Sequence, residues 1–258
     1  MRKSTAPLGQ TRGRRVRMAA VVCPTPPEYA ACRAALRLEQ ERKMGGRLVA
    51  GFDGPGMSLR AVKAWPGKAA CASAAQLLID VFRPHVVCDI GAAGALDTAL
   101  EPGTVICVER AYEYDAVPLE DFSSRAKELT FSTALAGAPA RVKKAMRDFM
   151  KKAQIRLPGP PLIFGDVACG ERDVGDASFR DRLREAFRAA ACDWETAAVL
   201  RTAARNDLPA LSFRVITDRA DRNLEADYRK NLAPALDRLG RFLTLFFEEK
   251  SPLSLFFG

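Results

Sequence analysis

Short apolar runs alternate with longer amphipathic stretches along the chain of 258 residues. The short runs, rich in β-branched side chains, predict buried strands, and the stretches with helical spacing predict helices. Expected strands cover residues 16–23, two segments of 45–64 joined by a Gly-Pro-Gly turn, 85–90, 103–112, 161–170, a short segment ending near Asp193, and 210–218. Expected helices cover residues 27–43, 67–82, 138–153, 177–190, 196–206 and 225–249, with Pro234 kinking or splitting the last. Residues 113–138 are polar and poorly periodic, so we expect a loop there.

This alternation predicts an α/β protein, a three-layer α/β/α sandwich around a central mixed, largely parallel sheet. The length suits one large domain or two small ones. We expect a single domain over residues 16–249, between a basic tail at residues 1–15 and an apolar C-terminal tail at residues 250–258. In folds of this class, ligands bind at the carboxyl ends of the strands.

Composition narrows the class of protein. The 48% hydrophobic and 28% charged residues are typical of a globular protein. No apolar run approaches the roughly 18 residues that a membrane-spanning helix needs, and the N-terminus lacks the apolar core of a secretory signal. Seven cysteines form no C-x-x-C pair, and several lie within apolar runs, which is typical of buried, reduced thiols. We therefore expect a cytoplasmic protein that does not bind membranes.

The net charge of +9 is concentrated at the N-terminus. Residues 1–17 contain no acid and carry the basic residues Arg2, Lys3, Arg12, Arg14, Arg15 and Arg17. Such a tail could contact nucleic acid, or it could be a solvated extension. Because it has no aromatic side chain to stack on bases, the second interpretation is favoured and nucleic acid is not expected as a partner.

The chain contains a single histidine, His85, which lies just before an expected strand. One histidine excludes a histidine-rich metal site and argues against a Ser-His-Asp triad. We expect a structural role for His85, and we expect neither a metal nor a cofactor.

Acidic residues stand at the ends of several predicted strands. Glu28 follows the first strand, and Glu195 and Asp218 follow or end later ones, while a glycine-rich segment at residues 91–94 follows the strand at 85–90. This placement predicts a pocket that these carboxylates share. Each residue also has a structural alternative, because glutamates favour the first turn of a helix and Asp218 could cap the helix that follows.

Four segments resemble one family. "RPHVVCDIGAAGALDTALEPGTVICVE" contains a strand, a glycine-rich loop and a Gly-containing strand, and the other segments are "GDVACGERDV", "CDWETAAV" and "LSFRVITDRAD". Each alone is a weak signal, but all four stand in the family's order and approximate spacing. Over residues 16 to 247 the chain resembles the nucleoside phosphorylase superfamily, and within it the 5'-methylthioadenosine/S-adenosylhomocysteine nucleosidase branch.

The resemblance implies catalytic roles for three carboxylates. Asp218 corresponds to the acid that shares a proton with purine N7, and Glu195 to the carboxylate that holds the ribose 2'- and 3'-hydroxyls. Glu28 corresponds to the glutamate that activates water. Breaking the N-glycosidic bond develops positive charge on the ribose and negative charge on the base. In the roles implied by the resemblance, the three carboxyl groups stabilise these charges and activate the attacking water.

The resemblance also implies a set of substrate-binding residues. Arg214 corresponds to an arginine near the nucleophile, which could pair with Glu28 or bind an anion, and Val174 meets the base through its backbone. Trp194 replaces a methionine and Thr217 a serine. The remaining expected pocket residues, from the glycine-rich loop, are Gly91, Ala92 and Gly94.

The implied function is that of a purine nucleosidase acting on an adenosine-type nucleoside such as 5'-methylthioadenosine or S-adenosylhomocysteine. Two alternative functions are a phosphate-dependent nucleoside phosphorylase and a nucleoside-binding protein with little activity. A phosphorylase would carry a Gly-Asp-Pro-x-Arg loop after the first strand, whereas this chain has "CPTPPEY". A nucleoside-binding protein with little activity is suggested by Ala64 in place of a serine and by Asp173 in place of an aromatic residue. The family usually forms homodimers or larger homo-oligomers.

Overall fold

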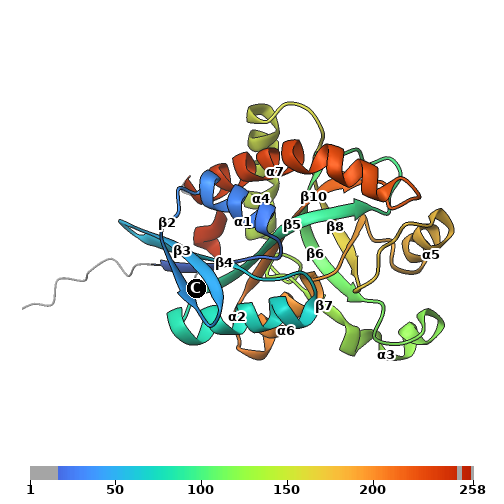
Figure 1. The fold of residues 1–258 in the computed structure, drawn as a ribbon, viewed down its shortest axis with the longest axis horizontal. Coiled ribbons are helices and arrows are strands. Elements are labelled where there is room, and N and C mark those ends of the chain that lie inside the picture. The colour runs from blue at the N-terminus through green and yellow to red at the C-terminus, as the bar shows by residue number, and fades with distance from the viewer. Residues whose placement is uncertain (1–16, 249–251, 257–258) are drawn as a thin grey trace, which may run out of the picture.

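A mixed sheet runs through the centre of the structure, a computed structural model that describes residues 17–248 and 252–256 (Figure 1). Its strands are β1 (Arg17–Cys23), β2 (Glu39–Met44), β3 (Arg47–Gly54), β4 (Met57–Lys63), β5 (Val86–Ala95), β6 (Val105–Glu113), β7 (Thr130–Ser132), β8 (Leu162–Cys169), β9 (Ala191–Asp193) and β10 (Ala210–Asp218). The helices are α1 (Pro26–Ala35), α2 (Lys68–Phe82), α3 (Phe122–Leu129), α4 (Ala140–Arg156), α5 (Ala177–Phe187), α6 (Thr196–Arg205) and α7 (Leu224–Glu248). Two 3-10 helices cover Leu119–Asp121 and Pro252–Leu255.

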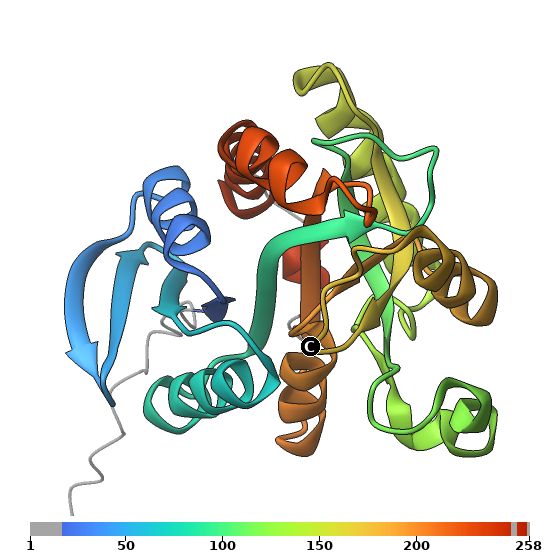
Figure 2. The same ribbon diagram turned by 45° about the vertical axis from the view of Figure 1, so that its right-hand side comes forward.

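The sheet follows the order β10-β6-β8-β9-β5-β1-β4-β3-β2, with β7 paired to β6. Strand β1 pairs in parallel with β4 and β5, and β5 pairs in parallel with β10. Because β10 also pairs with β6, the strands β5, β10, β6, β8 and β9 close into a ring. Figure 2 shows the teal strand β5, which belongs to this ring, curving across the molecule. The carboxyl ends of β1, β5 and β10 therefore open on the same side.

Helices cover both faces of the sheet, with α1, α4 and α7 on one face and α2 and α6 on the other (Figures 1 and 2). Strand β1 shows why. Its alternate residues Ala19, Val21 and Cys23 belong to the core under the first set of helices, whereas Ala20 and Val22 belong to the core under the second. A strand buried on both faces reads as a continuous apolar run, as the sequence indicated. The predicted fold class is confirmed.

The helix predicted over residues 27–43 was wrong in its second half. Helix α1 ends at Ala35, Arg37 adopts a positive φ of 50°, and the chain then enters strand β2. Strand β2 lies at the edge of the sheet and exposes its charged side chains, as edge strands commonly do. Its sequence, EQERKM, lacks the alternation of a half-buried strand, so its pattern resembled the polar face of a helix.

The loop predicted over residues 113–138 was also wrong in part, because it contains α3 and the short strand β7. These elements are held by a few buried side chains, among them Phe122 and Leu129, which is too sparse a pattern to detect in the sequence. Strand β5 continues to Ala95, through the segment predicted as a glycine-rich loop. Helix α7 runs unbroken past Pro234.

Both predicted tails fall largely outside the described residues. Residues 1–15 lie beyond them entirely, and only residues 252–256 of the C-terminal tail are described. Within that segment Leu253 is fully buried in the core that contains α4 and α7. Among the described helices, none is long and apolar enough to cross a membrane.

Candidate active site

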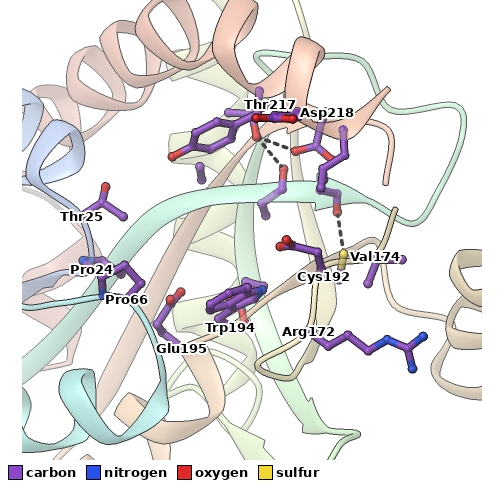
Figure 3. A pocket seen from close by; sticks show the side chains of 18 of the residues that line it. Pro24, Thr25, Pro66, Arg172, Val174, Cys192, Trp194, Glu195, Thr217 and Asp218 are labelled. Carbon is purple, nitrogen blue, oxygen red and sulfur yellow. Dashed lines mark hydrogen bonds between the residues drawn. The ribbon is translucent and has the colours of Figure 1, made fainter. Parts of the chain in front are cut away.

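A cavity of about 560 Å³ opens where the carboxyl ends of β1, β5, β9 and β10 meet. Figure 3 shows Glu195 and Pro66 on one side of it and Thr217 and Asp218 on the other. Eight residues that the sequence predicted for the site line this cavity: Glu28, Ala92, Gly94, Val174, Trp194, Glu195, Thr217 and Asp218. Gly91 and Arg214 do not line it and lie directly behind it.

Glu28 has both a structural and a pocket role. It lies in the first turn of α1, where it forms a reciprocal capping box with Thr25. Its Oε2 accepts hydrogen bonds from the backbone N–H and the hydroxyl of Thr25, each at 2.7 Å, and its Oε1 accepts one from Ala92 N–H at 2.7 Å. Burial raises the pKa of Glu28, and these donors oppose the rise. Helix α1 thus holds a buried carboxylate at the cavity wall.

Gly91 lets two charged groups approach each other. A Cβ at this position would collide with Nη1 of Arg214 and lie 2.7 Å from Oε1 of Glu28. A side chain at residue 91 would therefore push the arginine and the glutamate away from the cavity. The contribution of Gly91 to the site is this absence of a side chain.

Glu195 occupies the position before the first turn of α6 and is 6% exposed. Its Oε1 accepts a hydrogen bond from the backbone N–H of Gly67 at 3.0 Å, and its Oε2 lies 3.8 Å from Nη1 of Arg214. Burial raises the pKa of Glu195 to about 8, and the nearby arginine opposes the rise. The carboxylate points into the cavity in Figure 3.

Arg214 is fully buried and is held by acids other than the predicted Glu28. Its Nη2 donates to Asp89 at 2.6 Å, and its Nε lies 2.8 Å from Oδ2 of Asp193 and donates to Thr196 at 2.9 Å. The possible ion pair with Glu28 is thus corrected, because Asp89, on the neighbouring strand β5, is closer to the guanidinium. Its Nη1 has no hydrogen-bond partner in the described structure and stands behind Gly91, between Glu28 and Glu195.

Asp218 ends strand β10 and is 3% exposed. Its Oδ2 accepts a hydrogen bond from the hydroxyl of Thr217 and its Oδ1 one from Ala220 N–H, both at 2.9 Å. Helix α7 begins only at Leu224, so Asp218 does not cap it. Burial raises the pKa of this carboxyl group, which favours the protonated form that an acid catalyst needs.

The segment after β8 forms a different kind of wall. Arg172, Asp173 and Val174 line the cavity, and Val174 is buried while its two neighbours are exposed. The guanidinium of Arg172 lies 4.2 Å from the centre of the Phe179 ring and points away from Trp194 in Figure 3. This wall of the cavity thus differs from the others in that its charged residues, Arg172 and Asp173, are exposed and belong to neither a helix nor a strand.

Sequence reasoning missed several contributors to the site. Tyr228 and Leu224 line the cavity from the start of α7, and Pro66 lines it from the turn before α2. Burial and the surrounding carboxylates raise the pKa of Tyr228 to about 12. Nothing in the sequence marks these residues, because they reach the cavity through packing of distant elements. Asp89 could have been found, since an acid inside the apolar run "HVVCDI" requires a buried partner.

His85 has the structural role that the sequence favoured, because its Nδ1 accepts a hydrogen bond from Met18 N–H at 3.1 Å. Within the described part of the chain, no group of His, Cys, Asp and Glu side chains is arranged to hold a metal ion.

Comparison with known proteins agrees with this geometry. The family model described as "Phosphorylase superfamily" matches residues 19–248. The chain belongs to the phosphorylase superfamily. The buried arginine Arg214 and its acidic partners Asp89, Asp193 and Glu195 thus belong to a fold of that superfamily.

Curated relatives and solved structures extend the comparison. The 5'-methylthioadenosine/S-adenosylhomocysteine nucleosidase of Buchnera aphidicola subsp. Acyrthosiphon pisum is 24% identical over 190 residues, covering 72% of this chain and 78% of that protein. The nucleosidase of the same name from Colwellia psychrerythraea 34H, solved with adenine, superposes with a TM-score of 0.76 at 20% identity, covering 90% of this chain and 94% of the other. Futalosine hydrolase of Helicobacter pylori strain 26695 gives a TM-score of 0.75 at 16% identity, covering 89% and 97%. The two structures share the fold of this chain.

Proposed function

We propose that this phosphorylase-superfamily chain is a purine nucleosidase that hydrolyses the N-glycosidic bond of an adenosine-type nucleoside. The observation that carries the proposal is the convergence of Glu28, Glu195 and Asp218 on one cavity. The three residues come from segments far apart in the sequence, and burial raises the pKa of each. Groups with perturbed pKa values that share a cavity are characteristic of active sites.

Each carboxyl group has a distinct task in this reaction. Asp218, whose pKa is raised by burial, donates a proton to N7 of the purine as the bond to the base breaks. Glu195, in its ionised form, accepts hydrogen bonds from the ribose hydroxyls and offsets the positive charge that develops on the sugar. Glu28 takes a proton from water as the water oxygen bonds to the anomeric carbon. The products are the free purine and the free sugar, and the protons balance.

Hydrolysis is favoured over phosphorolysis by the chemistry around Glu28. A phosphate dianion at the anomeric carbon would lie beside this carboxylate and would be repelled. The segment from Cys23 to Glu28 also lacks the glycine amides and the arginine that would bind phosphate. Nη1 of Arg214, which has no hydrogen-bond partner in the described structure, favours an anion and keeps phosphorolysis as the second candidate.

The relatives suggest candidate substrates. The curated relative is named for 5'-methylthioadenosine and S-adenosylhomocysteine, and one structural neighbour is a futalosine hydrolase with nearly the same TM-score as a nucleosidase. We infer that the substrate is a nucleoside with a 5' substituent. Methylthioadenosine and S-adenosylhomocysteine are the first candidates, and futalosine is the second.

The test is purine release from each of these three nucleosides with and without added phosphate. We expect release without phosphate, and the Asp218→Asn variant should lower turnover by about 10²–10⁴-fold while still binding adenine. Release that depends on phosphate would establish the phosphorylase alternative. Binding without turnover in the wild-type protein would instead establish a nucleoside-binding protein.

We further propose that the chain acts in the cytoplasm as a homo-oligomer with residues 16–249 as its single domain. Seven buried cysteines, all free, support a reducing compartment. Trp65, beside the cavity residue Pro66, is 59% exposed, which supports a contact with another copy at this edge. Light scattering coupled to size-exclusion chromatography measures the assembly, and a monomer at micromolar concentration would contradict it.

A further inference from the structure

Helix α2 begins without a capping side chain of its own. Its N-cap residue is Gly67, which has a φ of +100°. Glu171, from the segment after β8, supplies the missing acceptor, because its Oε1 accepts the backbone N–H of Lys68 at 2.5 Å. A Cβ on Gly67 would collide with this same oxygen. The positive end of α2 is therefore capped by a carboxylate from a distant part of the chain.

The N–H group one residue earlier serves the active site. Gly67 N–H donates to Oε1 of Glu195 at 3.0 Å. Two consecutive N–H groups, of Gly67 and Lys68, thus donate to two different carboxylates, one inside the cavity and one outside it. The start of α2 is a bridge between Glu195 and Glu171.

Glu171 is itself held in place by charged neighbours. Its backbone N–H donates to Oδ2 of Asp115 at 2.8 Å, and Oδ1 of Asp115 accepts from the Lys68 ammonium at 2.5 Å. The same ammonium lies 3.1 Å from Glu113, which is 2.8 Å from Arg201. These contacts join the ends of β6 and β8 to the start of α2.

We propose that Glu171 is a positioning residue that keeps the Glu195 carboxylate directed at the ribose hydroxyls. The inference rests on the proposed function. Without Glu171, the carboxylate of Glu195 is the one side-chain acceptor that remains, in the described structure, for the two N–H groups at the positive end of α2. Glu195 would turn toward them, and its hydrogen bonds to the ribose would weaken. Glu171 does not itself line the cavity.

The readout that isolates this role is the preference for ribose over 2'-deoxyribose. We would measure kcat/KM for 5'-methylthioadenosine and for its 2'-deoxy analogue in the full chain and three Glu171 variants. Glu171→Ala should lower kcat/KM for the ribonucleoside by about tenfold and for the deoxy analogue much less, so that the preference falls. Glu171→Gln keeps an acceptor oxygen for Lys68 N–H and should retain the preference. Glu171→Asp keeps the charge but withdraws the oxygen and should behave like alanine.

A matched control is Glu128→Ala, which removes an exposed ion pair with Arg125 on α3 and should leave both rates unchanged. Thermal unfolding of each variant identifies any that fail to fold. If Glu171→Ala does not fold, the ribose preferences of Glu171→Gln and Glu171→Asp test the positioning role. An unchanged preference in Glu171→Ala and Glu171→Asp, or an equal fall for both nucleosides, would overturn the proposal. If the wild-type chain releases no purine, the proposed function fails separately, and the ratio of the two nucleosides' dissociation constants tests the positioning role instead.

Discussion

The two ends of the cavity are built in different ways. Behind the end of the cavity proposed for the ribose, Arg214 is fully buried and bonded to Asp89, Asp193 and Thr196. At the end assigned to the base, Arg172 and Asp173 are exposed on a segment without helix or strand. The groups proposed to act on the sugar are thus fixed by the core, whereas Asp173, on the segment proposed to meet the base, is exposed and free to vary without disturbing the core.

The largest expected difference between the two ends is in stability. Arg214→Met should lower the free energy of unfolding by about 3–5 kcal/mol, because Asp89 and Asp193 would remain buried without their cation. Arg172→Met, at the other end, removes an exposed arginine that stacks on Phe179 and should cost about 1 kcal/mol or less. Urea denaturation of the two variants measures both values. Equal losses would show that the two ends do not differ as described.

The next difference concerns pH. Burial raises the pKa of Glu195 to about 8 from an ordinary value of 4.5, so the folded state favours the protonated form. The contribution of Glu195 to the free energy of unfolding is fully present below pH 4.5 and is lost as pH rises through 8. The reason is that Glu195 loses its proton at a lower pH in the unfolded chain than in the folded protein. At about 1.4 kcal/mol per pKa unit, the wild-type protein should lose up to about 5 kcal/mol over this window through Glu195.

Glu195→Gln should remove this part of the pH dependence, since its amide does not titrate. Guanidinium denaturation of both proteins at several pH values between 4.5 and 8.5 measures the difference. A Glu195→Gln profile parallel to that of the wild type would contradict the assignment.

The fold was predictable because its signal is local. Strand β1 and strand β10 are apolar runs bounded by Pro24 and Asp218, and their pattern alone places them in the sheet. Strand β2 was missed because an exposed, charged edge strand carries no pattern of burial. The register that brings Asp89 beside Arg214 is a property of strand pairing between distant segments, which the pattern of one strand cannot report.

The residues of the candidate site also divide into those that the sequence could predict and those that it could not. Glu28, Glu195 and Asp218 were predicted because each stands at the end of an apolar element and matches a family motif. Tyr228 and Gly67 were not predicted, because Tyr228 reaches the cavity only through the packing of α7, and Gly67 acts through its backbone N–H. Sequence identifies the charged side chains at strand ends, while contacts made by the backbone or by helix packing require coordinates.

The smallest expected effect tests whether the exposed end selects the base. Asp173→Phe places an aromatic ring beside Val174, where the ring could stack on adenine. Stacking of this kind is worth about 0.5–1.5 kcal/mol, so adenine should bind roughly two- to tenfold more tightly. Calorimetric titration with adenine measures the change, and Arg172→Ala is the control, since its guanidinium stacks on Phe179 and points away from Trp194 (Figure 3). Weaker binding of adenine to Asp173→Phe would mean that the carboxylate of Asp173 accepts a hydrogen bond from the base, and base selection would then belong to the charged group itself.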